Sequence, residues 1–437
     1  MKIQKQSSRL VTPSYETKSY SYLSTSTTTV PLSPFDRAAG NAHMAIIYAY
    51  KAPTPPNSAL EIGLRLVLAD YREWAGRLTD DRRAIVLNDK GVRFVEATAS
   101  CTLEEATPFK STRQLWALHP SMKGIEELMQ VQLTRFTCGS LVIGYTTNHL
   151  VADGEATGRF LAAWGQATRG LSDYPVAIHD RVMLKPRDPL SIEFDHSGNE
   201  YMGKTLVKDV PWEKMVSDVR LHKAHFSPDF LAKLKARVSV RCLPGRGYST
   251  FECLVAHLWR KVTRARGVPA TETSQLRIPV NVRGRLVPPI PHEYFGNMVL
   301  WAFPRVTVRD LLGEPLNHVA EWVRAAIAQV NDRYVRSFVD FDTCVEIEGL
   351  WNELVPTAEV DSTVFCPNME VNSWLRLPFQ DVDFGSGGPD LFMPSCFPLE
   401  GVMVIVPSAH EKGGIEVYLS LFEANKAAFQ RICQSID

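Results

Sequence analysis

Residues 141–160 read LVIGYTTNHLVADGEATGRF, and this stretch decides the predicted fold. Its first residues, Leu141–Tyr145, have the alternating pattern of a β-strand and lead into HLVADG, residues His149–Gly154. From Glu155 to Thr168 the apolar spacing becomes that of an amphipathic helix, which Gly170 closes. A turn between a strand and a helix places side chains at the edge of a sheet, where α/β proteins bind ligands.

Strands and helices alternate along the rest of the chain, which predicts an α/β fold. Ser249 and Glu252 match a capping box and begin one of the helices. The predicted helices are Ser58–Trp74, Ser227–Val238, Ser249–Arg266 and Leu311–Val330. The predicted strands are Ala84–Leu87 and Val92–Ala97, read as a hairpin, then Glu127–Phe136, Ser140–Thr147, Gln275–Val280, Met298–Phe303, Val402–Val406 and Ile415–Ser420. A polar, proline-dotted segment predicts a division into a lobe over 1–180, a crossover over 181–220 and a second lobe over 221–437.

The composition narrows the class of protein. Of 437 residues, 45% are hydrophobic, which excludes bulk disorder, and 48 basic residues balance 48 acidic ones, which argues against nucleic-acid binding. No apolar run is long enough for a membrane span. The eight cysteines form no CxxC pair, so we expect no metal site, no disulfide framework and a cytoplasmic protein. The basic, Ser/Thr-rich residues 1–35 resemble a transit peptide, but we favour an edge strand at Ser8–Val11 followed by a polar loop over Lys18–Thr29.

Two local patterns suggest phosphate binding, and both have a simpler explanation. Gly198–Thr205 matches GxxxxGK[ST], but the residues before it are polar, Glu200 adds a negative charge and Pro211 follows, so the strand and helix of a P-loop are missing from the pattern. The basic residues Arg260, Lys261, Arg264 and Arg266 suit a solvated helix end better than a phosphate site. Motifs of serine hydrolases, zincins and Rossmann dehydrogenases are absent from the sequence.

The pattern HxxxD occurs twice. His225–Asp229 is explained by helix capping, since Ser227, Pro228 and Asp229 open a predicted helix. His149–Asp153 has the more informative context of a strand before it and a helix after it. Spacing alone leaves two interpretations of His149: a general base, or a structural histidine at a strand end.

Together with other segments, HxxxDG resembles the plant BAHD acyltransferases, and the similarity covers nearly the whole chain. The matching segments are Val11–Ser14, Leu32–Asp36, Ala75–Leu78, Val131–Gly139, His149–Gly154, Ser249–Arg260, Arg283–Leu286, Tyr294–Asn297 and the DFGxG motif Asp383–Gly387. The resemblance implies two chloramphenicol-acetyltransferase-like lobes, each a mixed β-sheet with flanking helices, and a channel at their interface. Two departures are Asn148, where many relatives have a second histidine, and Ser386, where the usual residue is tryptophan.

The family implies transfer of an acyl group from coenzyme A without a covalent enzyme intermediate. His149 is then the general base, with an imidazole suited to proton transfer near neutral pH. The resemblance assigns Trp374 and Asn372 to oxyanion or acceptor binding. It also implies that Asp153 supports the loop by pairing with Arg283 rather than by completing a triad, and that Asp383 and Gly385 are structural.

The resemblance is closest to the branch that acylates amines, such as agmatine coumaroyltransferases and tryptamine acyltransferases, as indicated by Asp70–Leu78, Ala167–Gly170 and Ser373–Arg376. In a strand, Glu370 and Asn372 project to one face, and we expect both to enter the cavity and bind the acceptor substrate. Agmatine enzymes carry two acids at the matching positions, so Asn372 favours a monoamine such as tryptamine. Agmatine or putrescine, an alcohol acceptor, and a catalytically silent binding protein remain alternatives. We expect a monomer that takes hydroxycinnamoyl- or benzoyl-coenzyme A as co-substrate, with no permanent cofactor, nucleic acid or membrane.

Overall fold

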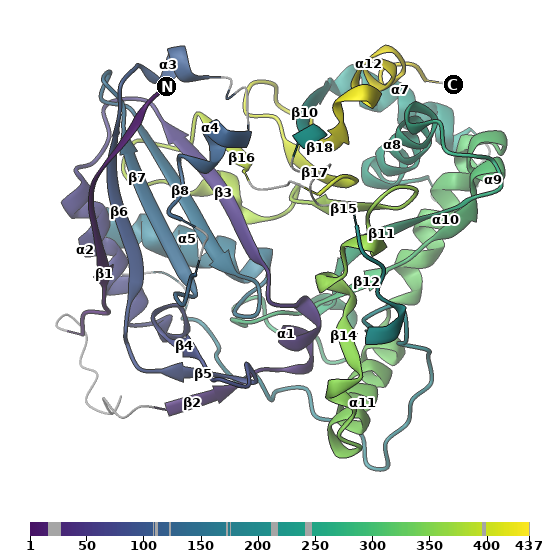
Figure 1. Ribbon diagram of the computed structural model, residues 1–437, viewed down its shortest axis with the longest axis horizontal. Coiled ribbons are helices and arrows are strands. Elements are labelled where there is room, and N and C mark those ends of the chain that lie inside the picture. The colour runs from purple at the N-terminus through teal and green to yellow at the C-terminus, as the bar shows by residue number, and fades with distance from the viewer. Residues whose placement is uncertain are drawn as a thin grey trace. The chain divides into compact units, whose positions relative to one another are not determined.

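The computed structural model describes residues 1–15, 28–107, 109, 112–121, 124–171, 174, 176–210, 217–240, 247–395 and 399–436. The chain forms two compact units, each with strands and helices around its own sheet (Figure 1). The first unit comprises Met1–Lys185, Ile290–Met298 and Arg376–Cys396, and the second comprises Pro186–Pro289, Val299–Leu375 and Phe397–Asp437. Two segments from the second half of the chain, Ile290–Met298 and Arg376–Cys396, therefore belong to the first unit. The sequence prediction instead divided the chain into continuous lobes.

The first unit is built on a six-stranded sheet in which only one neighbouring pair, β6 and β7, is parallel. Its order is β1 (Ile3–Val11), β6 (Val92–Ala99), β7 (Met129–Arg135), β8 (Leu141–Asn148), β3 (His43–Tyr50) and β16 (Leu391–Pro394). A three-stranded sheet consists of β2 (Thr28–Pro31), β5 (Ala84–Leu87) and β4 (Arg77–Leu78). Because β16 pairs with β3 antiparallel, the DFGxG region joins the sheet that carries His149.

Two helices of the first unit, α2 (Asn57–Leu68) and α5 (Gly154–Thr168), pack against each other. The Trp164 indole donates to the Leu60 carbonyl at 2.8 Å, and Gly63 lets the helices approach closely, because a Cβ there would lie 2.7 Å from the Thr168 amide nitrogen. From α5, Phe160 stacks on Tyr145 of β8, with ring centroids 6.4 Å apart. The shorter helices are α1 (Pro34–Ala39), α3 (Leu103–Ala106), α4 (Thr112–Trp116), η1 (Arg72–Ala75) and η7 (Pro378–Asp381).

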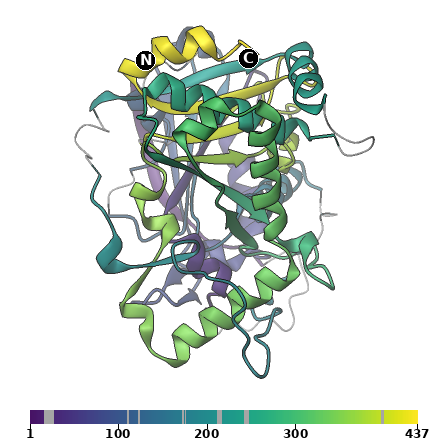
Figure 2. The ribbon, with the colours of Figure 1, turned by 90° about the vertical axis from the view of Figure 1, so that its right-hand side faces the viewer.

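The second unit contains a seven-stranded sheet. Its order is β10 (Val219–Phe226), β18 (Ile415–Phe422), β17 (Val402–Pro407), β15 (Met369–Ser373), β11 (Thr273–Asn281) and β12 (Val299–Ala302), and β13 (Arg305–Thr307) also pairs with β11. A two-stranded sheet joins β9 (Tyr201–Gly203) to β14 (Leu354–Pro356). The helices are α7 (Pro228–Ser239), α8 (Thr250–Arg266), α9 (Val308–Gly313), α10 (Leu316–Gln329), α11 (Asp332–Ile347) and α12 (Glu423–Ile432). The C-terminal helix α12, yellow in Figure 2, packs against α8.

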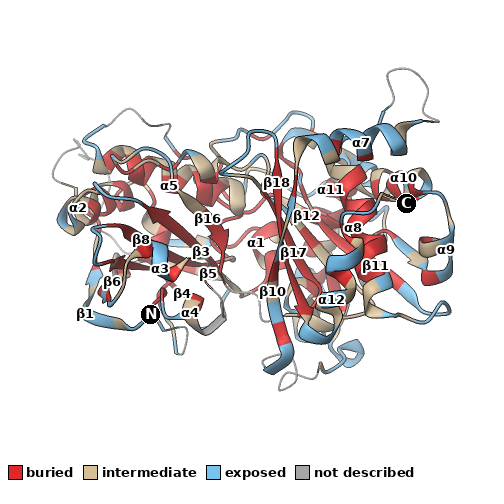
Figure 3. Ribbon diagram, turned by 90° about the horizontal axis from the view of Figure 1, so that it is seen from above, coloured by how far each residue is buried: buried red, intermediate tan, exposed pale blue. Residues whose placement is uncertain are grey.

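The inner strands of both sheets are mostly buried, whereas the edge strand β1 and the helix α7 expose much of their surface (Figure 3). The predicted edge strand near the N-terminus is confirmed, because β1 pairs with β6 at one edge of its sheet. The polar loop predicted over Lys18–Thr29 lies mostly outside the described residues. In the described ranges, no helix combines the length and the apolar character that crossing a bilayer requires.

Three predicted elements were wrong in whole or in part. The helix predicted over Ser58–Trp74 ends as α2 at Leu68, and the 3-10 turn η1 (Arg72–Ala75) follows it. Ala84–Leu87 and Val92–Ala97 do not form a hairpin, because β5 pairs with β2 and β4 while β6 pairs with β1 and β7. The linker turns away through Asp89 and Gly91, both with positive φ, and the Gly91 amide bonds the Ala75 carbonyl at 3.0 Å. The long helix predicted over Leu311–Val330 is split into α9 and α10, with Pro315 as the cap of α10.

Candidate active site

His149 is the first residue after β8, a strand that is buried along its whole length between β7 and β3. Four residues later, Asp153 is the N-cap of α5: its Oδ1 accepts a hydrogen bond from the Ala156 amide at 3.0 Å. This bond satisfies one of the free N–H groups of the first helical turn. The predicted strand–turn–helix unit is therefore confirmed, and His149 lies in its turn.

Hydrogen bonds from several directions fix the backbone around His149. The His149 amide donates to the Ala42 carbonyl at 2.8 Å, and the His149 carbonyl accepts from Asn297 Nδ2 at 2.8 Å. One residue earlier, Asn148 Oδ1 accepts from the Leu150 amide at 2.9 Å and so bridges the turn. Because both peptide groups of His149 are bonded to other segments, the main chain sets the position from which the imidazole projects.

A buried ion pair holds the Asn297 carboxamide. Asp36 Oδ1 accepts from the Asn297 backbone amide at 2.9 Å and from its Nδ2 at 2.8 Å. Asp36 Oδ2 lies 2.7 Å from the Arg181 guanidinium, and Arg181 also donates to the Val151 carbonyl at 2.7 Å. Burial opposes the charge of Arg181, but Asp36 and Glu73 outweigh it and raise the pKa of the guanidinium above its ordinary value. Arg181, Asp36 and Asn297 therefore form one bonded group that contacts the turn after β8 at two carbonyls, those of His149 and Val151.

The His149 side chain is partly exposed, and its Nδ1 is buried without a hydrogen-bond partner among the described residues. The Asp153 carboxylate does not supply that partner. Its Oδ1 caps α5, and its Oδ2 accepts from the Met298 amide at 2.9 Å. Asp153 therefore shapes the turn that carries His149 and does not orient the ring as the aspartate of a triad does.

Arg283, the partner expected for Asp153, is fully buried and belongs to the second unit. It opens the 3-10 turn η3 (Arg283–Arg285), where its amide donates to Asn281 Oδ1 at 3.0 Å. Its pairing with Asp153 stays a prediction. Neither the periodicity nor the spacing of the sequence distinguishes this arginine from its neighbour Arg285, so only the family resemblance singled it out.

Glu370 and Asn372 lie on β15 and face the same side, because Asn372 Nδ2 donates to Glu370 Oε1 at 2.6 Å. The second oxygen of Glu370 is also engaged. Arg277, its register partner on the parallel strand β11, bonds Glu370 Oε2 through Nε and Nη2. The charge of Glu370 is thus balanced inside the protein, which the sequence did not predict. Past the strand, Trp374 is buried and its amide donates to the Ile405 carbonyl at 2.8 Å.

Asp383 organises its own loop. Its Oδ1 accepts from the amides of Gly385 and Gly387 at 2.7 and 2.9 Å, and its Oδ2 lies 3.0 Å from the Arg169 guanidinium at the end of α5. Gly385 has φ 114°, a conformation that side chains disfavour. The neighbouring Phe384 packs edge-on against Trp164 of α5. These contacts tie the DFGxG loop to the helix that follows the histidine turn.

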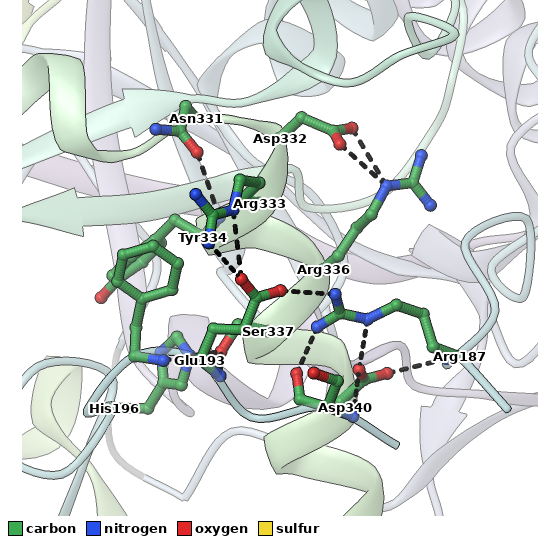
Figure 4. A network of polar contacts seen from close by, with 12 residues as sticks. Arg187, Glu193, His196, Asn331, Asp332, Arg333, Tyr334, Arg336, Ser337 and Asp340 are labelled. Carbon is green, nitrogen blue, oxygen red and sulfur yellow. Dashed lines mark hydrogen bonds and ion pairs between the residues drawn. The ribbon is translucent and has the colours of Figure 1, made fainter. Parts of the chain in front are cut away.

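The segment that matches a P-loop is bound to α11 instead of forming a phosphate cradle. The matching residues form the short strand β9, and Lys204 begins a 3-10 turn, η2 (Lys204–Leu206), where the lysine of a P-loop would begin an α-helix. Glu200 is buried, its Oε2 lies 2.9 Å from His196 Nδ1, and burial raises the pKa of its carboxyl. Figure 4 shows the surrounding network, in which Arg187 bonds Asp340 Oδ2 at 2.6 Å. The structure therefore offers no support for nucleotide binding at this motif.

The other weak candidates also have structural partners. Arg260 donates to the Leu311 carbonyl at 3.0 Å, and Arg266 forms a buried ion pair with Glu400 at 2.7 Å. These two arginines are not a solvated helix end, and that prediction was wrong for them. The histidine of the second HxxxD pattern, His225, bonds Glu416 and Glu411 at 3.0 and 2.7 Å.

Comparisons with known proteins show similarity along nearly the whole chain. The profile described as "Transferase family" matches residues 1–435. The chain is 44% identical to agmatine coumaroyltransferase-1 of Hordeum vulgare, with 100% of both chains covered, and 41% identical to tryptamine hydroxycinnamoyltransferase 2 of Oryza sativa subsp. japonica, with 93% of both covered. In structure it is similar to F. graminearum TRI101 complexed with coenzyme A and deoxynivalenol, at 15% identity, a TM-score of 0.76 and coverage of 92% and 97%.

Proposed function

The chain belongs to the Transferase family of BAHD acyltransferases, and from this premise we propose that it moves an aromatic acyl group from coenzyme A to an amine. The donor is hydroxycinnamoyl- or benzoyl-coenzyme A, and the product is an amide. The acyltransferases of this family use coenzyme A thioesters as co-substrates, and a structural relative binds coenzyme A. The observation that carries the proposal is His149, a partly exposed imidazole on a turn whose backbone is fixed.

His149 acts as the general base of the proposed reaction. The neutral amine attacks the thioester carbonyl carbon, and the C=O electrons move to the oxygen. His149 takes the proton from the attacking nitrogen. The electron pair on the oxygen then re-forms the C=O bond as the C–S bond breaks, and the C–N bond remains. The thiolate leaves with the C–S electron pair and receives that proton in turn. A general base of this kind contributes about 10²–10⁴-fold to rate.

Trp374 and Asn372 are proposed as donors to the oxyanion or contacts to the acceptor. An indole N–H is a donor of one hydrogen bond. The Asn372 side-chain amide carries a second N–H besides the one that is bonded to Glu370. Losing one oxyanion donor costs about 3–4 kcal/mol in transition-state stabilisation. We also propose that Arg283 pairs with Asp153 and that Asp383 and Gly385 act only through the fold.

The proposed acceptor is an arylalkyl monoamine such as tryptamine. Asn372 supports it, since a second carboxylate at this position would suit a second cationic group, and the bond between Glu370 and Arg277 supports it further. Agmatine is the second candidate, favoured by the 44% identity to the barley enzyme. An alcohol acceptor is the third. A cytoplasmic monomer stays a prediction.

The test is a free-thiol assay of the purified protein with a grid of acyl-coenzyme A donors against tryptamine, tyramine, agmatine, putrescine and shikimate. We expect thiol release with an aromatic donor and an amine. His149→Ala should lower the rate by about 10²–10⁴-fold while acyl-coenzyme A still binds. His225→Ala is the matched control, because it removes the histidine of the other HxxxD pattern. Release of no thiol with any acceptor would refute the proposal in favour of a silent binding protein.

A further inference from the structure

The Glu370 carboxylate has no free oxygen. Oε1 accepts from Asn372 Nδ2 at 2.6 Å, and Oε2 is bonded by both Nε and Nη2 of Arg277. The two charged residues are direct neighbours across the parallel strands β11 and β15, and their side chains are 7% and 13% exposed. Both N–H groups of the guanidinium reach one carboxylate oxygen, and hydrogen bonds between two charged groups are roughly twice as strong as neutral ones.

Arg277 cannot swing away from Glu370 without breaking other bonds. Its Nη1 donates to the Thr357 carbonyl at 2.6 Å and to Thr363 Oγ1 at 2.9 Å. Asp361 also faces this guanidinium: burial raises the pKa of the Asp361 carboxyl, and the Arg277 charge opposes that rise. Displacing the arginine would thus leave a nearly buried cation without its partner, which is strongly unfavourable.

We infer that Arg277 determines the acceptor class by occupying on Glu370 the place that a guanidinium or second ammonium group of a substrate would take. The inference rests on the proposed function, which places β15 at the amine acceptor. A dication such as agmatine or putrescine carries a second charge that needs an anionic partner, and here that partner is already neutralised. A monoamine with an apolar body loses nothing by this arrangement.

The inference is tested by the ratio of kcat/KM for agmatine to kcat/KM for tryptamine with one acyl-coenzyme A. Arg277→Gln frees Glu370 and should raise the ratio by about tenfold or more, the size of one desolvated charge contact. The double variant Arg277→Gln with Glu370→Gln removes both charges and should return the ratio to about the wild-type value. Asn372→Asp, which adds an acid but keeps Arg277, should raise the ratio less than Arg277→Gln does.

An unchanged ratio in Arg277→Gln, or an Asn372→Asp variant that raises it as much, overturns the inference. Should Arg277→Gln fail to fold by thermal denaturation, Glu370→Gln decides: an unpaired Arg277 should repel the dication and lower the ratio, and no change refutes the idea. Failure of the proposed function is a different result, because then the wild-type protein releases no thiol with any amine. If wild type and variants all acylate amines at one ratio, only the inference fails.

Discussion

Replacing Asn297 with alanine tests whether the buried Asp36 and Arg181 pair acts on His149 through one carboxamide. The change removes the 2.8 Å bond from Nδ2 to the His149 carbonyl and the 2.8 Å bond to Asp36, and keeps the backbone bond to Asp36. A neutral hydrogen bond contributes about 1 kcal/mol and one to a carboxylate about 1.5–3 kcal/mol. Asn297 Oδ1 is buried and has no hydrogen-bond partner among the described residues, so removing this oxygen offsets the loss by on the order of 1 kcal/mol. We therefore expect Asn297→Ala to lower the free energy of unfolding by about 1.5–3 kcal/mol.

The catalytic effect should exceed what this loss of stability explains. Freeing the His149 carbonyl lets the turn shift, and a displacement of about 1 Å costs about 10²-fold in rate. In the thiol-release assay, kcat should fall strongly while KM for the acyl donor stays near wild type. The control Asn331→Ala removes the N-cap of α11, with a cost of about 1 kcal/mol, and should keep kcat. Wild-type kcat in Asn297→Ala would refute the reasoning.

Two further changes probe the first unit. Gly144→Ala should lower the urea midpoint by the equivalent of about 1–3 kcal/mol, because its Cβ would lie 2.9 Å from the Leu118 carbonyl carbon. Gly313→Ala is the control, since the space around its Cβ is open. Equal urea midpoints for the two variants would contradict the packing argument. Burial lowers the pKa of His179, but the Glu73 carboxylate outweighs it and raises that pKa above 6.5. The ion pair of His179 and Glu73 therefore stabilises the fold fully below pH 6.5, and this stabilisation is lost as pH rises through the raised pKa. The difference in Tm between wild type and His179→Gln should therefore shrink as pH rises above 6.5, and a difference that stays constant would contradict the titration of this pair.

Local signals predicted the elements around the site well. The alternation before His149 predicted β8, and the spacing after it predicted α5. Ser249 and Glu252 predicted the start of α8, where both bonds of the capping box are present. Such features depend on residues three or four apart, so a single sequence contains them. The hairpin prediction failed because the pairing of β5 and β6 depends on distant strands, β2 and β1, which compete for the same edges.

The contacts that hold the site are long-range, and the sequence pattern carries little trace of them. Arg181 lies in a segment read as a polar crossover, yet it bonds Asp36 across 145 positions. Arg277 lies in a predicted strand, where an arginine normally faces solvent. Neither has a spacing or neighbour that distinguishes it from an ordinary surface charge, so only the folded chain shows that each neutralises a carboxylate.

The carboxylates that the sequence singled out are all engaged by the protein itself. Asp153 accepts from two backbone amides, Asp383 from two amides and Arg169, and Glu370 from Arg277 and Asn372. Acyl transfer from a thioester explains why this is compatible with catalysis. The thiolate is a good leaving group that needs little help from an acid, so one imidazole suffices for the proton taken from the amine. In the reaction that we propose, one imidazole is the obligatory base, so the carboxylates can serve to fix loops, and by our inference the amine substrate is selected by which of their charges the fold has already neutralised.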